Sequence, residues 1–161
     1  MQNLTEIKNH IVKNAFPELV NLEIPIRFEK VKNGISEFKR SGNRYSIIVS
    51  EIMKKAPVDI LEASIAHELA HILKEIKIGL INSWLDGILY YISKSYRIFD
   101  ERDTDFTVVV RGYGKHLLTL YEYRKTLQLK DYDDNGLLQN EIEKLLFLTN
   151  TTVPPKPLLQ T

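Results

Sequence analysis

The 161 residues of the chain include no cysteine. This absence excludes disulfide bonds and any zinc site built on thiolates, so histidine, glutamate and aspartate are left as the side chains able to hold zinc. No apolar run approaches the ~18 residues that a membrane-spanning helix needs, and the first residues lack the basic start and apolar core of a signal peptide. We therefore expect a cytoplasmic protein without a membrane partner.

A strong charge of either sign is also absent. The 22 lysine and arginine residues nearly balance the 21 aspartate and glutamate residues, which leaves a formal net charge of +1 and no dense basic segment. Proteins that bind nucleic acid present such a segment to the phosphates, so we expect no nucleic-acid partner. The length suits one core. We expect a single domain over residues 1–150 and a flexible, proline-containing tail over residues 151–161.

The most informative feature that is present is the segment His67-Glu68-Leu69-Ala70-His71, which has the form HExxH. On a helix that turns by ~100° per residue, His67 and His71 lie about 40° apart and one turn apart in height, so both imidazoles can reach one metal ion. Glu68 projects beside them, where its carboxylate can take a proton from water activated by the metal. In a chain of this composition, a chance match to the pattern has a probability of about one in a hundred.

The residues around this motif predict a largely buried helix. Pro57 ends the preceding segment, Asp59 stands where an N-cap is expected, and Glu62 completes a capping-box pattern three residues later. Small and apolar residues then follow up to the charged turn before Gly79. We expect the helix to begin near Asp59 and to end before Gly79.

The N-terminal part of the chain predicts one helix and a small sheet. Apolar residues recur at helical spacing over residues 4–16. Three later segments have the character of short strands and are separated by glycine-containing turns: residues 22–28, 35–38 and 44–49. We expect them to form a three-stranded antiparallel sheet packed on the HExxH helix.

The C-terminal half predicts helices. From residue 83 to about residue 111, apolar side chains step by three and four residues and form a core-facing stripe: Leu85, Leu89, Ile92, Tyr96 and Phe99. Gly112 and Gly114 break this pattern, and two further helices are expected over residues 117–129 and 137–148. The expected fold class is therefore α+β, with a small sheet and a helical C-terminal half.

An acidic segment offers the metal ligand that the HExxH motif lacks, because a catalytic zinc site uses three protein ligands. Glu101 and Asp105 stand four residues apart and share a face of the predicted helix. One carboxylate can bind the metal while the other accepts the free N–H of a ligand histidine. On a continuous helix, however, Asp103 falls on the core-facing stripe. Glu101 is the favoured third ligand, with Asp103 and Asp105 as alternatives.

The two motifs together resemble those of the gluzincin zinc metallopeptidases, in which HExxH is followed on a later helix by ExxxD, here Glu101-Arg102-Asp103-Thr104-Asp105. The stretch from Glu101 to Lys115 is also similar to small metallopeptidases of bacteria and phages. The resemblance implies a zincin-like fold and a Zn²⁺ cofactor. It assigns the residues as follows: His67, His71 and Glu101 as zinc ligands, Glu68 as general base, and Asp105 as the residue that orients a ligand histidine.

The same resemblance implies that the chain is a peptidase whose peptide or protein substrate lies extended beside an edge strand. Residues 44–50 are the candidate strand, because they precede the HExxH helix. Peptide hydrolysis also needs a donor to the tetrahedral oxyanion, and Arg111, Tyr113 and His116 are the candidates for this role.

Two other functions are alternatives. The first is a non-catalytic or regulatory metal-binding module that interacts with proteins on the same scaffold. The second is a calcium-responsive helical protein, because residues 131–136 match the first half of an EF-hand loop. Ile142 occupies the position at which that loop needs a bidentate glutamate, which argues against calcium.

Overall fold

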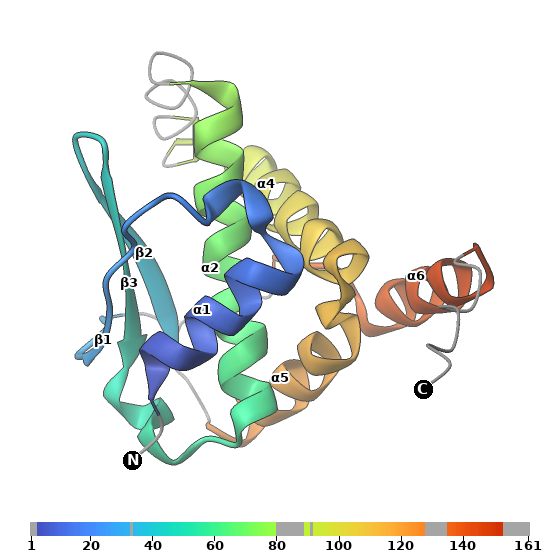
Figure 1. The fold of residues 1–161 in the computed structure, drawn as a ribbon. Coiled ribbons are helices and arrows are strands. Elements are labelled where there is room, and N and C mark those ends of the chain that lie inside the picture. Colours follow the sequence, from blue (N-terminus) through green and yellow to red (C-terminus); the bar gives the residue numbers. More distant parts are fainter. Residues whose placement is uncertain (1–2, 33, 80–88, 91, 128–134, 153–161) are drawn as a thin grey trace, which may run out of the picture.

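The computed structural model describes residues 3–32, 34–79, 89–90, 92–127 and 135–152. Helix α2 (Val58–Ile78), which carries the HExxH motif, runs through the middle of the molecule. Figure 1 shows the sheet on one side of α2 and helices α4 (Lys94–Val108) and α5 (Gly114–Thr126) on the other side. Helix α1 (Leu4–Ala15) also packs against α2. The expected α+β class is confirmed.

The sheet is mixed, so the expectation of an antiparallel sheet is wrong. Its strands are β1 (Ile26–Glu29), β2 (Ser36–Ser41) and β3 (Arg44–Ser50). They lie in the order β1-β3-β2, and β3 is antiparallel to β2 but parallel to β1. Alternating side chains identify a strand but do not specify its neighbours or their direction. The β2–β3 turn, by contrast, follows from Gly42, whose φ of 61° favours glycine.

Strand β3 lies in the centre of the sheet and is therefore not the edge strand that was expected over residues 44–50. In the part of the chain that the structure describes, β2 is the edge strand next to α2. The backbone N–H of Ser50 donates to the carbonyl of Ile35 at 2.8 Å. Because such bonds alternate along an antiparallel pair, the N–H and C=O groups of Ser36 and Phe38 point away from β3.

Helix α2 is buried over most of its length because small and apolar residues occur on nearly all its sides. It begins at Val58, and Pro57 at the N-cap position makes no side-chain hydrogen bond. The predicted cap at Asp59 is therefore wrong, although an acidic residue in the first turn still suits the helix dipole. Glu62 does not complete a capping box, since its Oε2 faces Nε2 of His116 at 3.4 Å.

The core-facing stripe predicted for residues 85–99 is wrong where the structure describes it. Helix α4 begins only at Lys94, after an N-cap formed by Ser93, so the stripe does not belong to one continuous helix. Leu89, Ile92 and Phe99 are 43%, 74% and 63% exposed; Leu85 lies outside the described residues. The buried residues of α4 are instead mainly polar: Asp100, Thr104, Asp105 and Val108.

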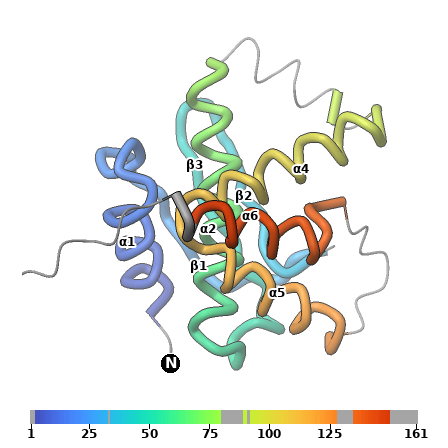
Figure 2. The backbone as a smooth tube through the Cα atoms, turned by 90° about the vertical axis from the view of Figure 1, so that its right-hand side faces the viewer, coloured from blue at the N-terminus to red at the C-terminus, as the bar shows by residue number. Residues whose placement is uncertain are grey.

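The predicted break at Gly112 is confirmed. Helix α4 gives way to a single π-helical turn (Val109–Tyr113), within which Gly112 has a φ of 95°. Helix α6 (Gln139–Thr152) then lies on the side of α5 turned away from the sheet (Figure 2). Its close approach requires Gly114, because a Cβ there would lie 2.8 Å from Cδ2 of Leu146.

Two further expectations concern segments that lie partly outside the described residues. Helix α6 extends two residues into the predicted tail, and residues 153–161 lie outside the description. The EF-hand-like half-loop falls mostly within residues 128–134, which also lie outside the description.

No described helix is long and apolar enough to cross a membrane. The cytoplasmic location expected from the sequence stays a prediction.

Candidate metal centre

Helix α2 meets β2 and α4 on two adjoining sides. Alternate residues of β2 face successive turns of α2: Ser36 bonds to Glu68, Phe38 stacks on His71, and Arg40 pairs with Glu75. At ~100° per residue, these three α2 residues cover a sector of about 60°. His67 lies about 40° outside this sector, on the side that faces α4. The two histidines of the motif therefore lie where β2 and α4 adjoin on α2.

Glu101 of α4 completes a triad with these histidines. Nε2 of His67 lies 3.2 Å from Nε2 of His71 and 3.2 Å from Oε2 of Glu101, and Oε1 of Glu101 lies 3.9 Å from Nε2 of His71. One ligand atom from each residue falls within 4.8 Å of the others. A tetrahedral zinc ion with bonds of ~2.05 Å separates its ligand atoms by about 3.3 Å. The spacing of the triad therefore fits a zinc ion.

Asp105 determines which nitrogen of His67 can bind a metal. Its Oδ1 lies 3.0 Å from Nδ1 of His67, so the neutral ring carries its proton on Nδ1 and presents a lone pair at Nε2. Its Oδ2 accepts hydrogen bonds from the hydroxyl of Tyr121 and, at 2.8 Å, from the backbone N–H of Leu137. Asp105 is 1% exposed, and its contacts match the orienting role that the resemblance implies.

His71 is oriented in a similar way. Its Nδ1 lies 3.3 Å from Oγ1 of Thr104 and 3.6 Å from Oδ2 of Asp100, which favours a proton on Nδ1 and a lone pair on Nε2. The lone pairs of both Nε2 atoms and the oxygens of Glu101 thus converge on one point. A positive charge among these acceptors stabilises them, and a divalent metal ion would supply it.

The pKa values of His67 and Glu101 also indicate that a positive charge is favoured between the carboxylates. Burial lowers the pKa of His67, but its hydrogen bonds to Asp105 and Glu101 outweigh burial and raise that pKa to about 10. Burial raises the pKa of Glu101, yet contacts with His67, His71 and the hydroxyl of Tyr90 hold it well below its usual range. A proton on His67 or a metal ion can therefore compensate the carboxylates, and binding of the metal would release the proton.

Three residues that no motif indicated support the triad. The hydroxyl of Tyr90 donates to Oε1 of Glu101 at 2.7 Å. The ring of Phe38 stacks on His71 at a centroid distance of 5.6 Å, and Lys74 forms an ion pair with the buried Asp100. Lys74 follows His71 by three residues, so its place on the same helix face was predictable from the sequence. Tyr90 and Phe38 come from distant segments and had no such signal.

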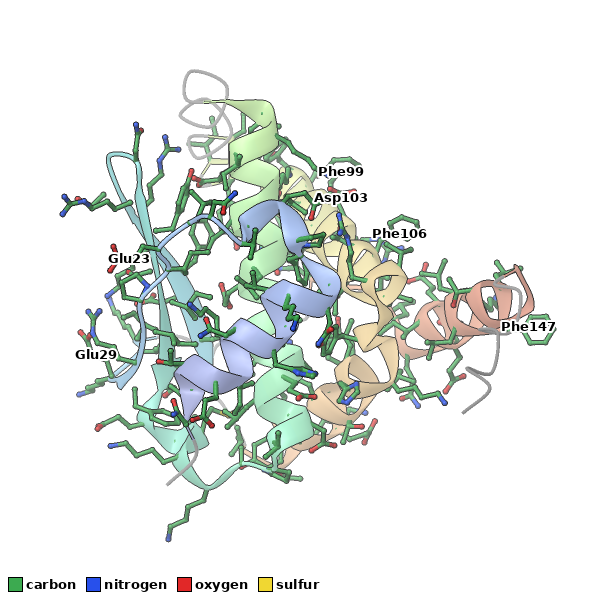
Figure 3. The ribbon with its side chains drawn as sticks, in the orientation of Figure 1. Glu23, Glu29, Phe99, Asp103, Phe106 and Phe147 are labelled. Atoms are coloured by element: carbon green, nitrogen blue, oxygen red, sulfur yellow. The ribbon has the colours of Figure 1, made fainter. Side chains whose placement is uncertain are left out.

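Asp103, one of the alternative third ligands, is exposed. Figure 3 shows it between Phe99 and Phe106 on the side of α4 turned away from α2. Asp105, the other alternative, faces Nδ1 of His67 rather than the Nε2 side. Of the three acidic candidates, only Glu101 lies where it can share a metal ion with both histidines.

The three candidates for oxyanion stabilisation have other contacts. Arg111 donates to both carboxylate oxygens of Glu18 and, at 2.7 Å, to the carbonyl of Ala15. The ring of Tyr113 lies 5.5 Å from that of His116, and His116 faces Glu62 on an earlier turn of α2. No contact among the described residues joins these three side chains to the triad, so their proposed role in catalysis stays a prediction.

A cavity of about 660 Å³ lies apart from the triad. It lies between the β2–β3 hairpin and residues 22–25, and neither the triad nor Glu68 lines it. The candidate site is therefore defined by its convergent side chains and not by this cavity. Comparison with protein-family models, with curated proteins and with solved structures finds no significant match.

Proposed function

We propose that the protein is a zinc-dependent metallopeptidase of the gluzincin type with a zincin-like fold. The observation that carries this proposal is the convergence of His67, His71 and Glu101 next to a further buried carboxylate, Glu68, on the same helix. A zinc ion held by this triad would activate a water molecule and polarise the scissile carbonyl. The donor set of two imidazoles and one carboxylate is that of a catalytic zinc site, which keeps its fourth position open.

Glu68 has the role of general base in this proposal. Its carboxylate takes a proton from the attacking water and passes the proton to the leaving nitrogen as the peptide bond breaks. The side chain is 6% exposed, so this proton transfer takes place in surroundings largely closed to bulk water. Asp105 holds the ring of His67 in the tautomer that presents Nε2 to the metal.

The substrate in this proposal is a peptide or protein segment that lies extended along β2. The N–H and C=O groups of Ser36 and Phe38 point to the outer edge of β2, where a peptide can add as a further strand. The side chains of the same two residues contact Glu68 and His71. A peptide on this edge therefore passes close to the general base and to one metal ligand.

Zinc analysis and peptide cleavage by matched variants test the proposal. Wild-type protein purified without chelator is incubated with a mixture of proteome-derived peptides, and new termini are identified by mass spectrometry. Glu68→Gln keeps the shape of the side chain but cannot accept a proton, so zinc content should persist while turnover falls by at least about 100-fold. Glu51→Gln, a change of the same kind in an exposed ion pair with Lys54, is the control and should cleave normally.

The second candidate function is a metal-binding module that regulates or binds proteins without cleaving them. The burial of Glu68 and its hydrogen bond to Ser36 favour this candidate, because they restrict access to the base. Zinc-loaded wild-type protein that cleaves no peptide would support this second function and contradict the first. Full turnover in Glu68→Gln would remove Glu68 from the mechanism.

A further inference from the structure

Ser36 of β2 and Glu68 of α2 are joined by a hydrogen bond that links the edge strand to the general base. The hydroxyl of Ser36 donates to Oε1 of Glu68 at 2.7 Å. Ser36 accepts in turn from the hydroxyl of Ser64 at 2.7 Å, and Ser64 is fully buried one helical turn before Glu68. Because a hydroxyl that accepts one bond directs its own proton elsewhere, Ser64 orients the proton of Ser36 toward the carboxylate.

The side chain and the backbone of Ser36 face different parts of the proposed site. Its side chain points to α2, whereas its N–H and C=O groups point to the outer edge of β2. A peptide paired with that edge would contact the backbone of the residue whose hydroxyl holds the base. The distance between the peptide and the carboxylate is thereby fixed through one residue.

We propose that Ser36 is a positioning residue that sets the orientation of the Glu68 carboxylate relative to a peptide bound on β2. This inference rests on the proposed peptidase function. The bond from Ser36 occupies Oε1 of Glu68 and leaves Oε2 as the oxygen that accepts the proton of the attacking water. Without this bond no contact among the described residues of β2 fixes the rotation of the carboxylate, and the base is misplaced in the transition state.

Ser36→Ala tests the positioning role through the separation of kcat from KM. The backbone edge that binds the peptide is unchanged, so KM should stay within about twofold of wild type. The misplaced base should lower kcat by about 10-fold to 100-fold. Ser36→Thr keeps the hydroxyl and should restore most of the lost kcat. Ser46→Ala, on the central strand and on the face turned away from α2, is the matched control and should leave kcat unchanged.

A second readout does not depend on activity. In urea unfolding of the metal-free protein, Ser36→Ala, Glu68→Ala and the double variant form a thermodynamic cycle, because Ala at either position removes the contact. Because of this contact, the effect of one change on the unfolding equilibrium constant should differ by on the order of tenfold between the presence and the absence of the other change. Should Ser36→Ala fail to fold, Ser36→Cys keeps the side-chain size, replaces the hydroxyl with a weaker donor, and should lower kcat in the same direction.

These experiments distinguish a failure of the positioning role of Ser36 from a failure of the proposed peptidase function. If the wild type cleaves peptides and Ser36→Ala has the same kcat, or if the cycle shows no coupling, Ser36 has no positioning role and only this inference fails. A loss of kcat that Ser36→Thr does not restore also overturns it, because the hydroxyl is then not the cause. If the zinc-loaded wild type cleaves no peptide, the proposed function fails and this inference fails with it.

Discussion

Asp105 and His67 are joined by a hydrogen bond of 3.0 Å between Oδ1 and Nδ1, on the edge of the imidazole opposite to Glu101. The two acidic residues stand four positions apart on α4, and this spacing places them about one turn apart on one helix face. One imidazole ring therefore lies between two carboxylates. The carboxylate on the Nε2 side is suited to bind a metal, and the one on the Nδ1 side is suited to hold the ring.

The first prediction separates these two roles. Asp105→Ala should weaken zinc affinity by ~10–100-fold, since it removes only the group that orients His67. Glu101→Ala should abolish tight binding, because it removes a ligand of the metal. Competition against a chelator of known affinity measures both, and circular dichroism checks that each variant folds. The reverse order of the two effects would make Asp105 the third ligand.

The second prediction concerns Gly136, which lies against the same carboxylate. A Cβ at this position would overlap Oδ2 of Asp105 and the hydroxyl of Tyr121. Gly136→Ala should therefore destabilise the fold by about 1–3 kcal/mol, the range for overpacking a buried site. Urea unfolding measures this loss. No loss of stability in Gly136→Ala would contradict the packing described.

The third prediction uses the contact between Arg111 and Glu18. Hydrogen bonds from Arg111 hold the pKa of Glu18 below its ordinary value. A carboxylate with a lowered pKa stabilises the fold above the ordinary pKa, and this contribution disappears as the pH falls through the lowered value. The pair is partly exposed, so Glu18→Gln should cost no more than about 1 kcal/mol at neutral pH. At pH 3 the difference in unfolding free energy should be smaller.

Glu18→Gln should leave the zinc content unchanged, since its partner Arg111 has no described contact with the triad. A difference in stability that is the same at pH 3 and pH 7 would show that the charge of Glu18 is not the cause. A loss of zinc in this variant would connect this ion pair to the metal centre, contrary to the geometry.

The candidate metal centre was more predictable from the sequence than the fold around it. The spacing within HExxH places His67 and His71 on one face of a helix whatever surrounds it, and the same argument pairs Glu101 with Asp105. The stripe through Leu89, Ile92 and Phe99 failed because hydrophobic periodicity assumes that the buried face of a helix is apolar. Helix α4 buries polar residues instead, which is expected where a helix contributes to a site.

Contacts between distant segments were not predictable. Strand order is decided by packing between β1, β2 and β3, and alternation in each strand is the same for a parallel and an antiparallel neighbour. For this reason β2 was not recognised as the edge strand. The partners that β2 brings to α2, Ser36 and Phe38, were missed with it. Tyr90, which donates to Glu101, likewise lies in no pattern that marks a site.

The most direct test of the account is the zinc content of the purified protein, measured by mass spectrometry after loading with zinc and removal of unbound metal. We predict about one zinc ion per chain in the wild type, as a three-ligand site requires. His71→Ala should lose this zinc, whereas His10→Ala, which changes an exposed histidine on α1 next to Asn14, should keep it. A wild-type protein without zinc, or His71→Ala with unchanged zinc content, would contradict the proposed metal centre.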